Sequence, residues 1–364
     1  MSEKRILVAL SGGVDSAVAA GLLVAQGVPV AAAYMKNWIN EDGIIGDCPW
    51  EQDVGDARAI AQHLGIDFEV VNLMDAYKAR IVDMLLDGYA KGGTPNPDVF
   101  CNREIKFGVF RDWARAKGFG AVATGHYARQ QTGRDGQAEI LTGLDPNKDQ
   151  TYFLCMMQQA QARDAVFPIG HLRKDRVRAE ARRMRLPVAE KKDSQGICFI
   201  GNIRMRDFLA AYLPDEPGAI VLPNGKQIGA HQGLHFYTIG QRKGLAVASP
   251  VYGKHYVVIE KRVETRELVV ALETPDVEGL YAESCILHSV SFVGPALHVP
   301  ASIEARARYR APSVPISYAP LPNACAMVRW SQPQRALAAG QICALYDGEK
   351  LLGGGIYGEI KFAK

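Results

Sequence analysis

Short apolar runs alternate with helical patterns along the first third of the chain. Between the runs, small and apolar residues recur at a helical period over 16–26 and 53–64, and a glycine follows each stretch. Alternation of this kind predicts a parallel sheet with helices on both faces, a doubly wound α/β domain. Ligands of such domains bind beyond the carboxyl ends of the strands. The runs with the length of buried strands are residues 6–10, 28–34, 68–71 and 121–124.

The pattern changes in the second half of the chain. Residues 150–205 are helical and basic in pattern, whereas an Asn-Gly pair in LPNGKQIG separates two short apolar runs and predicts a hairpin. Evenly spaced short strands then predict a small antiparallel β-barrel. We expect these strands at residues 285–293, 302–310, 324–330, 341–346 and 351–359.

Two segments rich in proline and acidic residues, AYLPDEPG and LETPDVEGL, are candidate domain boundaries. We therefore expect a doubly wound parallel-sheet domain at 1–207, a small β-rich central domain at 208–277 and a C-terminal antiparallel β-barrel at 278–364. We find neither an internal repeat nor a low-complexity tract.

Composition narrows the class of protein. Of 364 residues, 48% are hydrophobic and 22% charged, as in ordinary soluble domains. A net charge of +3 provides no global field for a polyanionic partner, so local clusters must supply one. The chain has no signal-type apolar start and no apolar segment near the ~18 residues of a membrane span. We expect a cytoplasmic protein without a membrane partner, and a monomer.

The loop after the first strand, SGGVDS, has the composition of an anion site. Gly12 and Gly13 let backbone N–H groups approach an anion closely, and the following helix adds its positive end. Ser11 and Ser16 offer hydroxyl groups. Asp15 would repel a bare phosphate, so we expect it to cap the helix or to act through a magnesium ion. An ordinary strand–helix turn with capping side chains is the alternative.

The same loop lacks the lysine of the Walker phosphate loop, and the chain has no G-x-G-x-x-G. SGGVDS resembles the pyrophosphate-loop signature of the ATP pyrophosphatases, which cleave ATP between its α- and β-phosphates and adenylate a substrate oxygen. The resemblance implies ATP, with Mg²⁺ beside it. In these enzymes the loop binds the β,γ-pyrophosphate that leaves and not a γ-phosphoryl group that is transferred, which is consistent with the missing lysine.

Seven scattered cysteines without a C-x-x-C pair argue against a zinc ribbon and against a disulfide framework. Cys101 stands out, because Asp98 lies three residues before it and is placed to move a proton. Arg103 and Lys106 follow closely and would lower the pKa of the thiol. A rigid proline-containing loop with a buried cysteine is the alternative.

Cys198 is the second candidate, in EKKDSQGICFIG. Two lysines precede it and glycines flank it, which suits a mobile and reactive thiolate. We expect the other thiols to be packing residues, with Cys48 most simply idle and metal binding as its alternative. The expected packing thiols are Cys155, Cys285, Cys325 and Cys343.

Several further blocks occur in a fixed order, including YMKNW, ATGHYAR, KDQTYFL, YTIGQRKGL, ARYR and LGGGI. Together with the loop and the two cysteines, they make nearly the whole chain resemble the family of bacterial tRNA 2-thiouridylases. The resemblance implies ATP-dependent adenylation of the C2 oxygen of the wobble uridine. Sulfur would then come from a persulfide on Cys198, and a Cys101–Cys198 disulfide would remain. It also implies a sulfur-relay protein or a cysteine desulfurase as donor.

The resemblance carries site residues as well. It makes Cys101, Cys198 and Asp98 catalytic. ATP would contact Ala9, Leu10, Ser11, Gly12, Gly13, Val14, Asp15, Ser16, Met35 and Gly125. The target uridine and the rest of the tRNA would contact Asn96, Pro97, Asp98, His126, Lys148, Asp149, Gln150, Tyr309, Arg310 and Gln341.

Two basic stretches add to the tRNA hypothesis. Residues 173–185 carry seven basic and two acidic side chains, which suits phosphate contacts, with a solvated helix face as the alternative. In IEARARYR, alternation predicts Arg306, Arg308 and Arg310 on one strand face. His126 could also be a general base.

Two rival functions belong to other classes. A pyrophosphate-loop enzyme that amidates a small acid would need an ammonia source, and no glutaminase-like segment is evident. A non-catalytic ATP sensor or RNA-binding module would be expected to have a degenerate site, yet Ser11, Asp15, Ser16 and both cysteines are intact.

Overall fold

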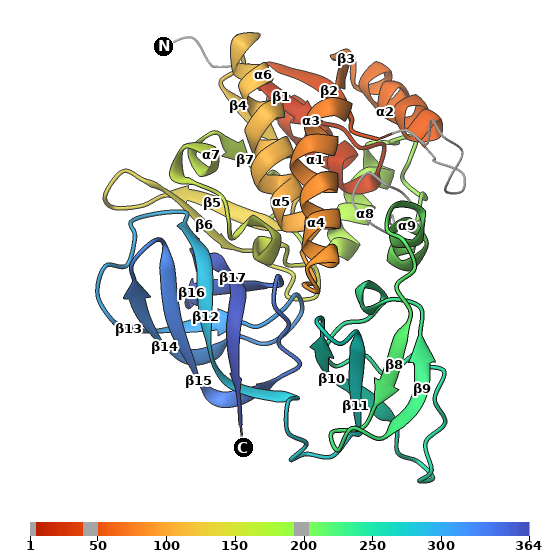
Figure 1. The fold of residues 1–364 in the computed structure, drawn as a ribbon. Helices are drawn as coiled ribbons and strands as arrows, with labels where there is room; N and C mark the ends of the chain where they lie inside the picture. Colours follow the sequence, from red (N-terminus) through yellow and green to blue (C-terminus); the bar gives the residue numbers. More distant parts are fainter. Residues whose placement is uncertain (1–4, 39–49, 193–203, 364) are drawn as a thin grey trace.

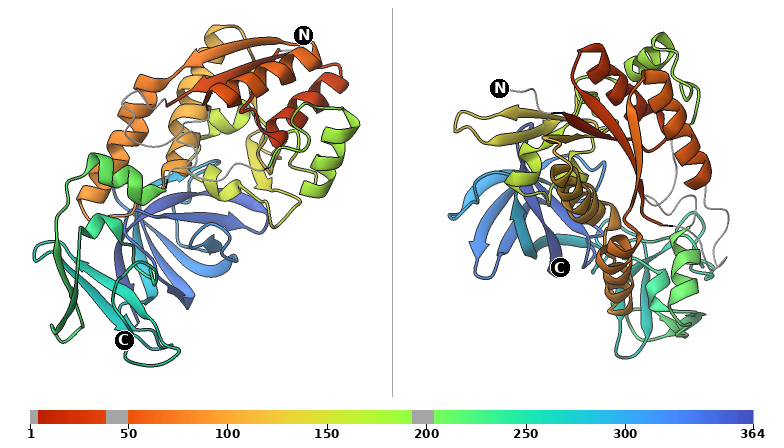
Figure 2. Two further views of the ribbon diagram at one scale, coloured as in Figure 1. Left: turned by 90° about the vertical axis from the view of Figure 1, so that its right-hand side faces the viewer. Right: turned by 90° about the horizontal axis from the view of Figure 1, so that it is seen from above.

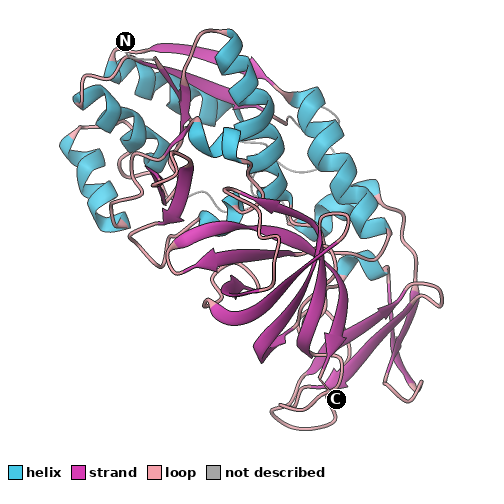
Figure 3. Cartoon of the chain, turned by 90° about the vertical axis from the view of Figure 1, so that its left-hand side faces the viewer, coloured by secondary structure: helices cyan, strands magenta, loops and turns pink. Residues whose placement is uncertain are grey.

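The computed structural model describes residues 5–38, 50–192 and 204–363. Helices gather at one end of the molecule around a parallel sheet, whereas strands dominate the other end (Figures 1 and 3). Within the described ranges, no helix has both the length and the apolar composition needed to cross a membrane.

The α/β part is built on a parallel sheet whose described strands are in the order β3-β2-β1-β4-β7. Alternate residues of β1 face opposite cores: Leu7 lies in one apolar cluster and Val8 in another. A parallel sheet buried on both faces gives continuous apolar runs, which explains the pattern in the sequence. The strands are β1 (Ile6–Ala9), β2 (Val30–Lys36), β3 (Asp67–Asn72), β4 (Ala121–Ala123) and β7 (Ala165–Val166).

Helices cover both faces of this sheet, so the predicted doubly wound fold is confirmed. One face is packed by α1 (Val14–Ala25), α2 (Trp50–Leu64) and α8 (Lys174–Arg183). The other is packed by α3 (Met74–Tyr77), η1 (Lys78–Val82), α4 (Asp83–Ala90), α5 (Pro97–Phe100), η2 (Cys101–Val109) and α6 (Phe110–Ala116).

Helix η2 is π-helical and continues directly from α5 into α6. Gly108 breaks the regular conformation there, with φ −102° and ψ −105°. A Cβ at this position would lie 2.8 Å from the carbonyl oxygen of Arg103, so glycine permits the close approach. Short π segments are frequent at functional sites, and this one begins at Cys101.

The central domain is a small sheet in the order β10-β11-β8-β9. The predicted hairpin is confirmed: Asn224 and Gly225 form the turn, and Gly225 has a φ of +83°. The elements here are α9 (Met205–Tyr212), β8 (Gly218–Val221), β9 (Gln227–His231), η4 (Leu234–Phe236), β10 (Tyr256–Arg262) and β11 (Glu267–Leu272).

The C-terminal strands close into the predicted antiparallel barrel, because β12 pairs with both β15 and β17. Figure 2 shows the barrel packed beside the helices of the α/β part. The strands are β12 (Tyr281–Phe292), β13 (Ala301–Arg306), β14 (Val314–Leu321), β15 (Cys325–Arg335), β16 (Ile342–Asp347) and β17 (Lys350–Phe362).

A hairpin from the α/β part extends this barrel sheet. It consists of β5 (Ala128–Thr132) and β6 (Ala138–Thr142), and Leu141 of β6 pairs with Lys350 of β17. The sequence did not predict it, because ARQQT carries no apolar run. The segments η3 (Thr151–Leu154) and α7 (Gln159–Arg163) follow between this hairpin and β7.

One predicted strand is wrong in extent. Strand β13 ends at Arg306, so Arg306, Arg308 and Arg310 do not share a strand face. The backbone turns there, with Ala311 N–H donating to the Arg308 carbonyl at 3.1 Å and Arg310 at a φ of +63°. The side chain of Arg306 turns to a buried carboxylate, Asp149, while Arg308 and Arg310 are exposed.

Candidate active site

The loop between β1 and α1 is organised by its own hydroxyl groups. Ser16 Oγ donates to the Gly13 carbonyl at 3.1 Å, and the Ser11 N–H donates to Ser16 Oγ at 3.2 Å. Gly12 has a φ of +73°, and a Cβ on it would lie 2.5 Å from the Asp53 carbonyl oxygen. Only glycine fits this position, so the loop is pressed against the start of α2 with its hydroxyls held close together.

Asp15 is tied to two remote side chains. Tyr127 Oη donates to Asp15 Oδ1 at 2.8 Å, and Lys174 Nζ donates to Oδ1 and Oδ2 at 2.8 and 3.0 Å. The capping hypothesis is wrong, because Gly13 is the N-cap of α1 and no side chain caps this end. A lysine from a distant segment, residue 174 at the start of α8, therefore lies at the loop.

A second lysine reaches the same loop. Lys191 Nζ donates to the Gly12 carbonyl at 3.1 Å and to the carboxylates of Asp53 and Asp56, each at 2.7 Å. Partial burial alone would lower the pKa of Lys191, but the two carboxylates outweigh it and the pKa is raised. Lys191 therefore keeps its charge beside the loop.

Gly125 and Met35 belong to the two segments next to β1 in the sheet. Gly125 follows β4, and a Cβ on it would lie 2.6 Å from the backbone nitrogen of Ser16. This segment therefore packs directly on the first turn of α1. Met35 lies near the end of β2 with its side chain 4% exposed in the core cluster.

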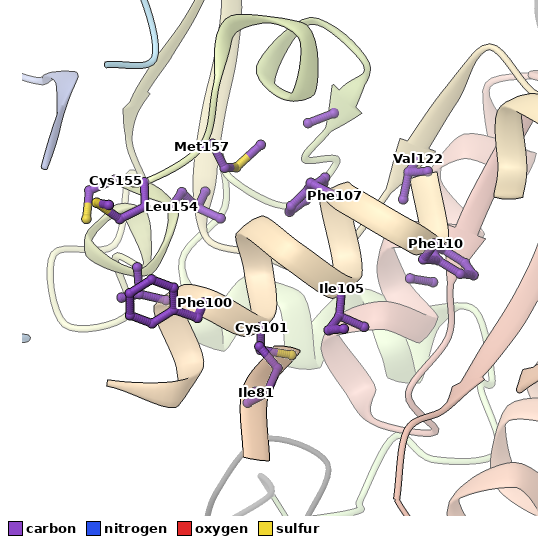
Figure 4. Close-up of a cluster of buried hydrophobic side chains, with 14 of the residues drawn as sticks. Ile81, Phe100, Cys101, Ile105, Phe107, Phe110, Val122, Leu154, Cys155 and Met157 are labelled. Carbon is purple, nitrogen blue, oxygen red and sulfur yellow. The ribbon is translucent and has the colours of Figure 1, made fainter. Parts of the chain in front are cut away.

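Cys101 lies in an apolar environment at the start of η2. Its side chain is 1% exposed, and Figure 4 shows it beside Ile81 in the core cluster. Of the two cations expected near the thiol, Arg103 and Lys106, the first pairs with Glu104 at 2.6 Å and lies over the Phe100 ring at 4.9 Å. The thiol is therefore enclosed in this conformation.

The segment before Cys101 is fixed by caps. Asn96 Oδ1 accepts from the Val99 N–H at 3.3 Å, and Pro97 occupies the first turn of α5. Asp98 is partly exposed on the same turn. Asn102 Nδ2 donates to the Asp98 carbonyl at 3.1 Å and to that of Phe153 at 3.3 Å, which ties α5 to η3.

The other cysteines divide into three groups. Cys198 and Cys48 lie outside the described residues. The expected packing role is confirmed for Cys155, Cys285 and Cys343, which are at most 2% exposed. Burial raises the pKa of Cys285 to about 12. Cys325 differs, because it is partly exposed and its Sγ lies 3.2 Å from His288 Nδ1.

His126 is buried beside the loop after β4. Its Nδ1 lies 2.7 Å from Thr124 Oγ1, and its ring packs against Phe107 and Phe167. Burial, assisted by the charge of Lys106, holds the pKa of His126 well below its usual value. An imidazole with so low a pKa is a weak base, which favours positioning over proton transfer.

The segment 148–150 is held between the α/β part and the barrel. Asp149 is 6% exposed, accepts from the Gly143 N–H at 2.9 Å and pairs with Arg306 of the barrel. Gln150 Oε1 accepts from the Tyr127 N–H at 3.0 Å. Lys148 and Gln150 are partly exposed.

The barrel reaches the α5 segment from the other side. Gln341 Nε2 donates to the Thr94 carbonyl at 2.8 Å, just before Asn96. The Tyr309 ring lies 4.4 Å from that of Phe153, between their centroids, and the Arg310 guanidinium lies over the Tyr309 ring. The structure thus brings the expected tRNA residues of both parts around α5 and η3.

Helix α8 uses much of its charge within the fold. Arg178 donates to the Ala189 and Lys191 carbonyls at 3.0 and 2.6 Å, and Arg182 and Arg183 pair with Glu190 and Glu180. Arg173 and Arg176 are exposed. Arg182 and Arg183 are exposed as well, but their acidic partners offset part of the positive charge that this helix presents to solvent.

Sequence reasoning missed the roles of Lys174, Tyr127 and Lys191. Their partners on the loop lie more than 100 positions away in the chain, so no local pattern marks them. The absent loop lysine is the signal that could have found them, because a cation from another segment explains that absence as well as a bound pyrophosphate does.

Family comparisons cover nearly the whole chain. A model described as the tRNA methyl transferase HUP domain matches residues 4–202. A tRNA methyl transferase PRC-barrel domain matches 206–272, and an aminomethyltransferase beta-barrel domain matches 282–357. These matches follow the order of the α/β part, the central sheet and the barrel.

Curated relatives match from end to end. The tRNA-specific 2-thiouridylase MnmA of Akkermansia muciniphila is 54% identical, covering 98% of this chain and 99% of that protein. The proteins of the same name from Neisseria meningitidis serogroup B and Ralstonia pickettii are each 44% identical over 98% of this chain. They are covered over 95% and 96% of their own lengths.

Proposed function

Because the chain belongs to the family of tRNA-specific 2-thiouridylases, we propose that it thiolates C2 of the wobble uridine of tRNA in a reaction that consumes ATP. It is an enzyme, a tRNA sulfurtransferase. The observation that carries the proposal is the SGGVDS loop at the carboxyl end of β1, which Lys174 and Lys191 reach from distant segments. The Cys101 side chain lies in the core cluster that also contains Ala9 of β1 and Met35 of β2.

ATP fits the loop by charge and by geometry. The backbone N–H groups of Gly12 and Gly13 and the hydroxyls of Ser11 and Ser16 would hold the β,γ-pyrophosphate. Lys174 would turn from Asp15 to the phosphates, as a lysine does in other phosphate loops. A loop that binds the β,γ-pyrophosphate is consistent with cleavage of ATP between its α- and β-phosphates.

Mg²⁺ would accompany ATP. Among the described residues, no group of three or more His, Cys, Asp or Glu side chains is arranged so that it could hold a metal ion. Magnesium commonly binds through one or two carboxylates together with substrate phosphates, and the Asp15 carboxylate suits that mode. The ion would supply neutralisation of phosphate charge.

Adenylation prepares the uracil for sulfur. The C2 oxygen is a poor leaving group until it carries AMP. It attacks the α-phosphorus of ATP, and the bond between that phosphorus and pyrophosphate breaks. The resulting AMP ester leaves readily. Asn96, Pro97 and Asp98 would line the extruded uridine, because the reacting carbon cannot be reached within a stack. Asp98 would move the proton of the base.

Sulfur would come from a persulfide on Cys198. The Cys101 thiolate attacks Cys198 Sγ, the terminal sulfur leaves as hydrosulfide, and a Cys101–Cys198 disulfide forms. Hydrosulfide adds to C2 and AMP departs. A dithiol reductant then restores both thiols, which suits a cytoplasmic location. Because Cys101 is enclosed, this step requires a local rearrangement.

The donor of the persulfide would be a sulfur-relay protein or a cysteine desulfurase, and we propose that the enzyme acts as a monomer. The tRNA would lie over the exposed cations of both parts, with Lys148, Tyr309 and Arg310 close to the anticodon and Arg173 and Arg176 farther along the surface.

The Cys198→Ala variant tests the sulfur-carrier role. We expect it to abolish thiolation and leave ATP and tRNA binding intact, because the thiol carries sulfur and holds neither substrate. Mass analysis of tRNA nucleosides from cells that contain only this variant gives the readout. Cys325→Ala, at a partly exposed thiol outside the site, is the matched control. Normal 2-thiouridine in the Cys198 variant would refute the assignment.

A further inference from the structure

Asn37 is a buried amide that finds no hydrogen-bond partner among the residues that the structure describes. It is 2% exposed, and neither Oδ1 nor Nδ2 is paired within residues 5–38, 50–192 and 204–363. Buried polar groups are nearly always paired, because an unpaired one loses its bonds to water. An asparagine that keeps both ends unpaired therefore needs an explanation outside the packing of the protein.

The residue stands at the ligand edge of the parallel sheet. It follows β2 directly, and β2 pairs with β1, whose last residue precedes the SGGVDS loop by two positions. The Leu10 N–H donates to the Ala33 carbonyl at 2.9 Å, so β2 runs on beyond the point where β1 gives way to the loop. Nucleotides in such sheets bind at this edge.

The backbone around Asn37 is anchored on both sides. The Leu73 N–H donates to the Lys36 carbonyl at 2.9 Å, and Trp38 packs edge-on against Phe208 and Tyr212 of α9. The unpaired amide therefore does not result from a loose segment. The fold holds this amide in place without giving it a partner, as expected for a preorganised recognition group.

We propose that Asn37 recognises the adenine of ATP through its carboxamide. The inference rests on the proposed use of ATP. An asparagine amide presents an acceptor beside a donor, and adenine presents the complementary amino group beside a ring nitrogen. A phosphate has no N–H to offer, so it would leave Oδ1 unpaired.

The position of Asn37 favours adenine over the target uracil. Asn37 follows the strand beside the nucleotide loop, two residues after Met35, whereas the proposed uridine site is formed by Asn96, Pro97 and Asp98 on α5. Bound adenine would satisfy both amide atoms. The unpaired amide is unfavourable in the free enzyme, and the specificity that it provides in the complex offsets this cost.

A double cycle tests the contact. Dissociation constants are measured by calorimetry for ATP and for purine riboside triphosphate, which lacks the amino group, on the full-length wild type and on Asn37→Leu. We expect Asn37→Leu to weaken ATP roughly tenfold to a hundredfold and to affect the analogue much less, because the lost bond involves that amino group. Asn72→Leu, at the end of the adjacent strand, should leave both ligands unaffected, since its Oδ1 is used by the Met74 N–H.

Thermal unfolding separates recognition from folding. Asn37→Leu removes a buried unpaired amide at similar volume, so the melting temperature of the free protein should stay the same or rise while ATP binding weakens. Asn37→Ser provides a smaller replacement for the same cycle.

Three outcomes would overturn the inference: unchanged ATP affinity, an equal loss for both triphosphates, or weaker ATP binding accompanied by a lower melting temperature in both variants. Unchanged ATP affinity with lost thiolation would place Asn37 at the uridine instead. Failure of the wild type to bind ATP would contradict the proposed function and not this contact.

Discussion

At the scale of single residues, the SGGVDS loop contains no basic residue, and the positive charge beside it comes from other segments. Lys174 contacts Asp15, and Lys191 contacts the Gly12 carbonyl, so two lysines from distant segments stand at the SGGVDS loop. Lys174 also has Tyr127 as a neighbour on the same carboxylate. We interpret Lys174 as the cation that leaves Asp15 for the pyrophosphate when ATP binds.

Replacing Lys174 tests this interpretation. We expect Lys174→Met to weaken ATP binding about tenfold to a hundredfold, because a hydrogen bond to a charged group contributes ~1.5–3 kcal/mol. Calorimetry with ATP gives the affinity. Arg176→Met, on the exposed side of the same helix, should bind ATP as the wild type does. Wild-type affinity in Lys174→Met would show that the lysine only shields Asp15.

Lys261 provides a pH test in the central domain. Removal from water lowers its pKa from 10.5 to about 8, and its Nζ donates to the Tyr237 carbonyl at 3.0 Å. Between these two values the unfolded chain binds more protons, so the free energy of unfolding rises with pH across that window. We expect a contribution on the order of 1–3 kcal/mol. Urea unfolding from pH 8 to 10 should show that rise reduced in Lys261→Met, and an identical pH dependence would refute it.

The local part of the site could be predicted from the sequence. Ser11, Gly12, Gly13 and Ser16 are contiguous, and their geometry follows from a glycine turn before a helix. The cap assigned to Asp15 was wrong, because the side chain is drawn to Tyr127 and Lys174 instead. Partners so far apart in the chain leave no periodic pattern in the sequence.

At the scale of elements, α8 both contacts the SGGVDS loop and presents charge to solvent. Its first residue, Lys174, reaches Asp15, and Arg178 holds the segment up to Lys191. Arg173 and Arg176 remain exposed at the same end. The basic composition was evident in the sequence, but its division between internal and exposed roles depends on packing.

The exposed end of α8 gives a salt-dependent prediction. We expect the double variant Arg173→Gln/Arg176→Gln to bind tRNA more weakly, with a plot of log affinity against log salt shallower by about 2, since each phosphate contact adds ~0.7–0.9 to the slope. Filter binding at several salt concentrations gives the slope. ATP affinity should not change, and an unchanged slope would place the tRNA elsewhere.

At the scale of the whole molecule, the barrel and the α/β part form one unit around α5. The β5–β6 hairpin extends the barrel sheet (Figure 1). Gln341 donates a hydrogen bond to the Thr94 carbonyl, and Arg306 pairs with Asp149. The hairpin could not be predicted, because its polar strands gain their partner only in the assembled fold. The doubly wound sheet and the barrel could be predicted, because their apolar runs are long and regular.

Breaking the Arg306–Asp149 pair tests this coupling. Arg306→Met leaves a buried carboxylate without its cation, and we expect a loss of about 3 kcal/mol in the free energy of unfolding. Urea unfolding measures the change. Asp149→Asn in the same chain should restore part of the loss, and Arg308→Met, exposed two residues later, should change stability by less than about 0.5 kcal/mol. Equal effects of Arg306→Met and Arg308→Met would refute the coupling.

The central claim is that ATP is cleaved between its α- and β-phosphates to activate uridine for sulfur. The most direct measurement incubates the purified chain with ATP, a sulfide source and transcribed tRNA, and quantifies nucleotides and 2-thiouridine together. The account predicts AMP and pyrophosphate in equal amounts, each matching the 2-thiouridine formed. Formation of ADP and phosphate, or 2-thiouridine without consumption of ATP, would contradict it.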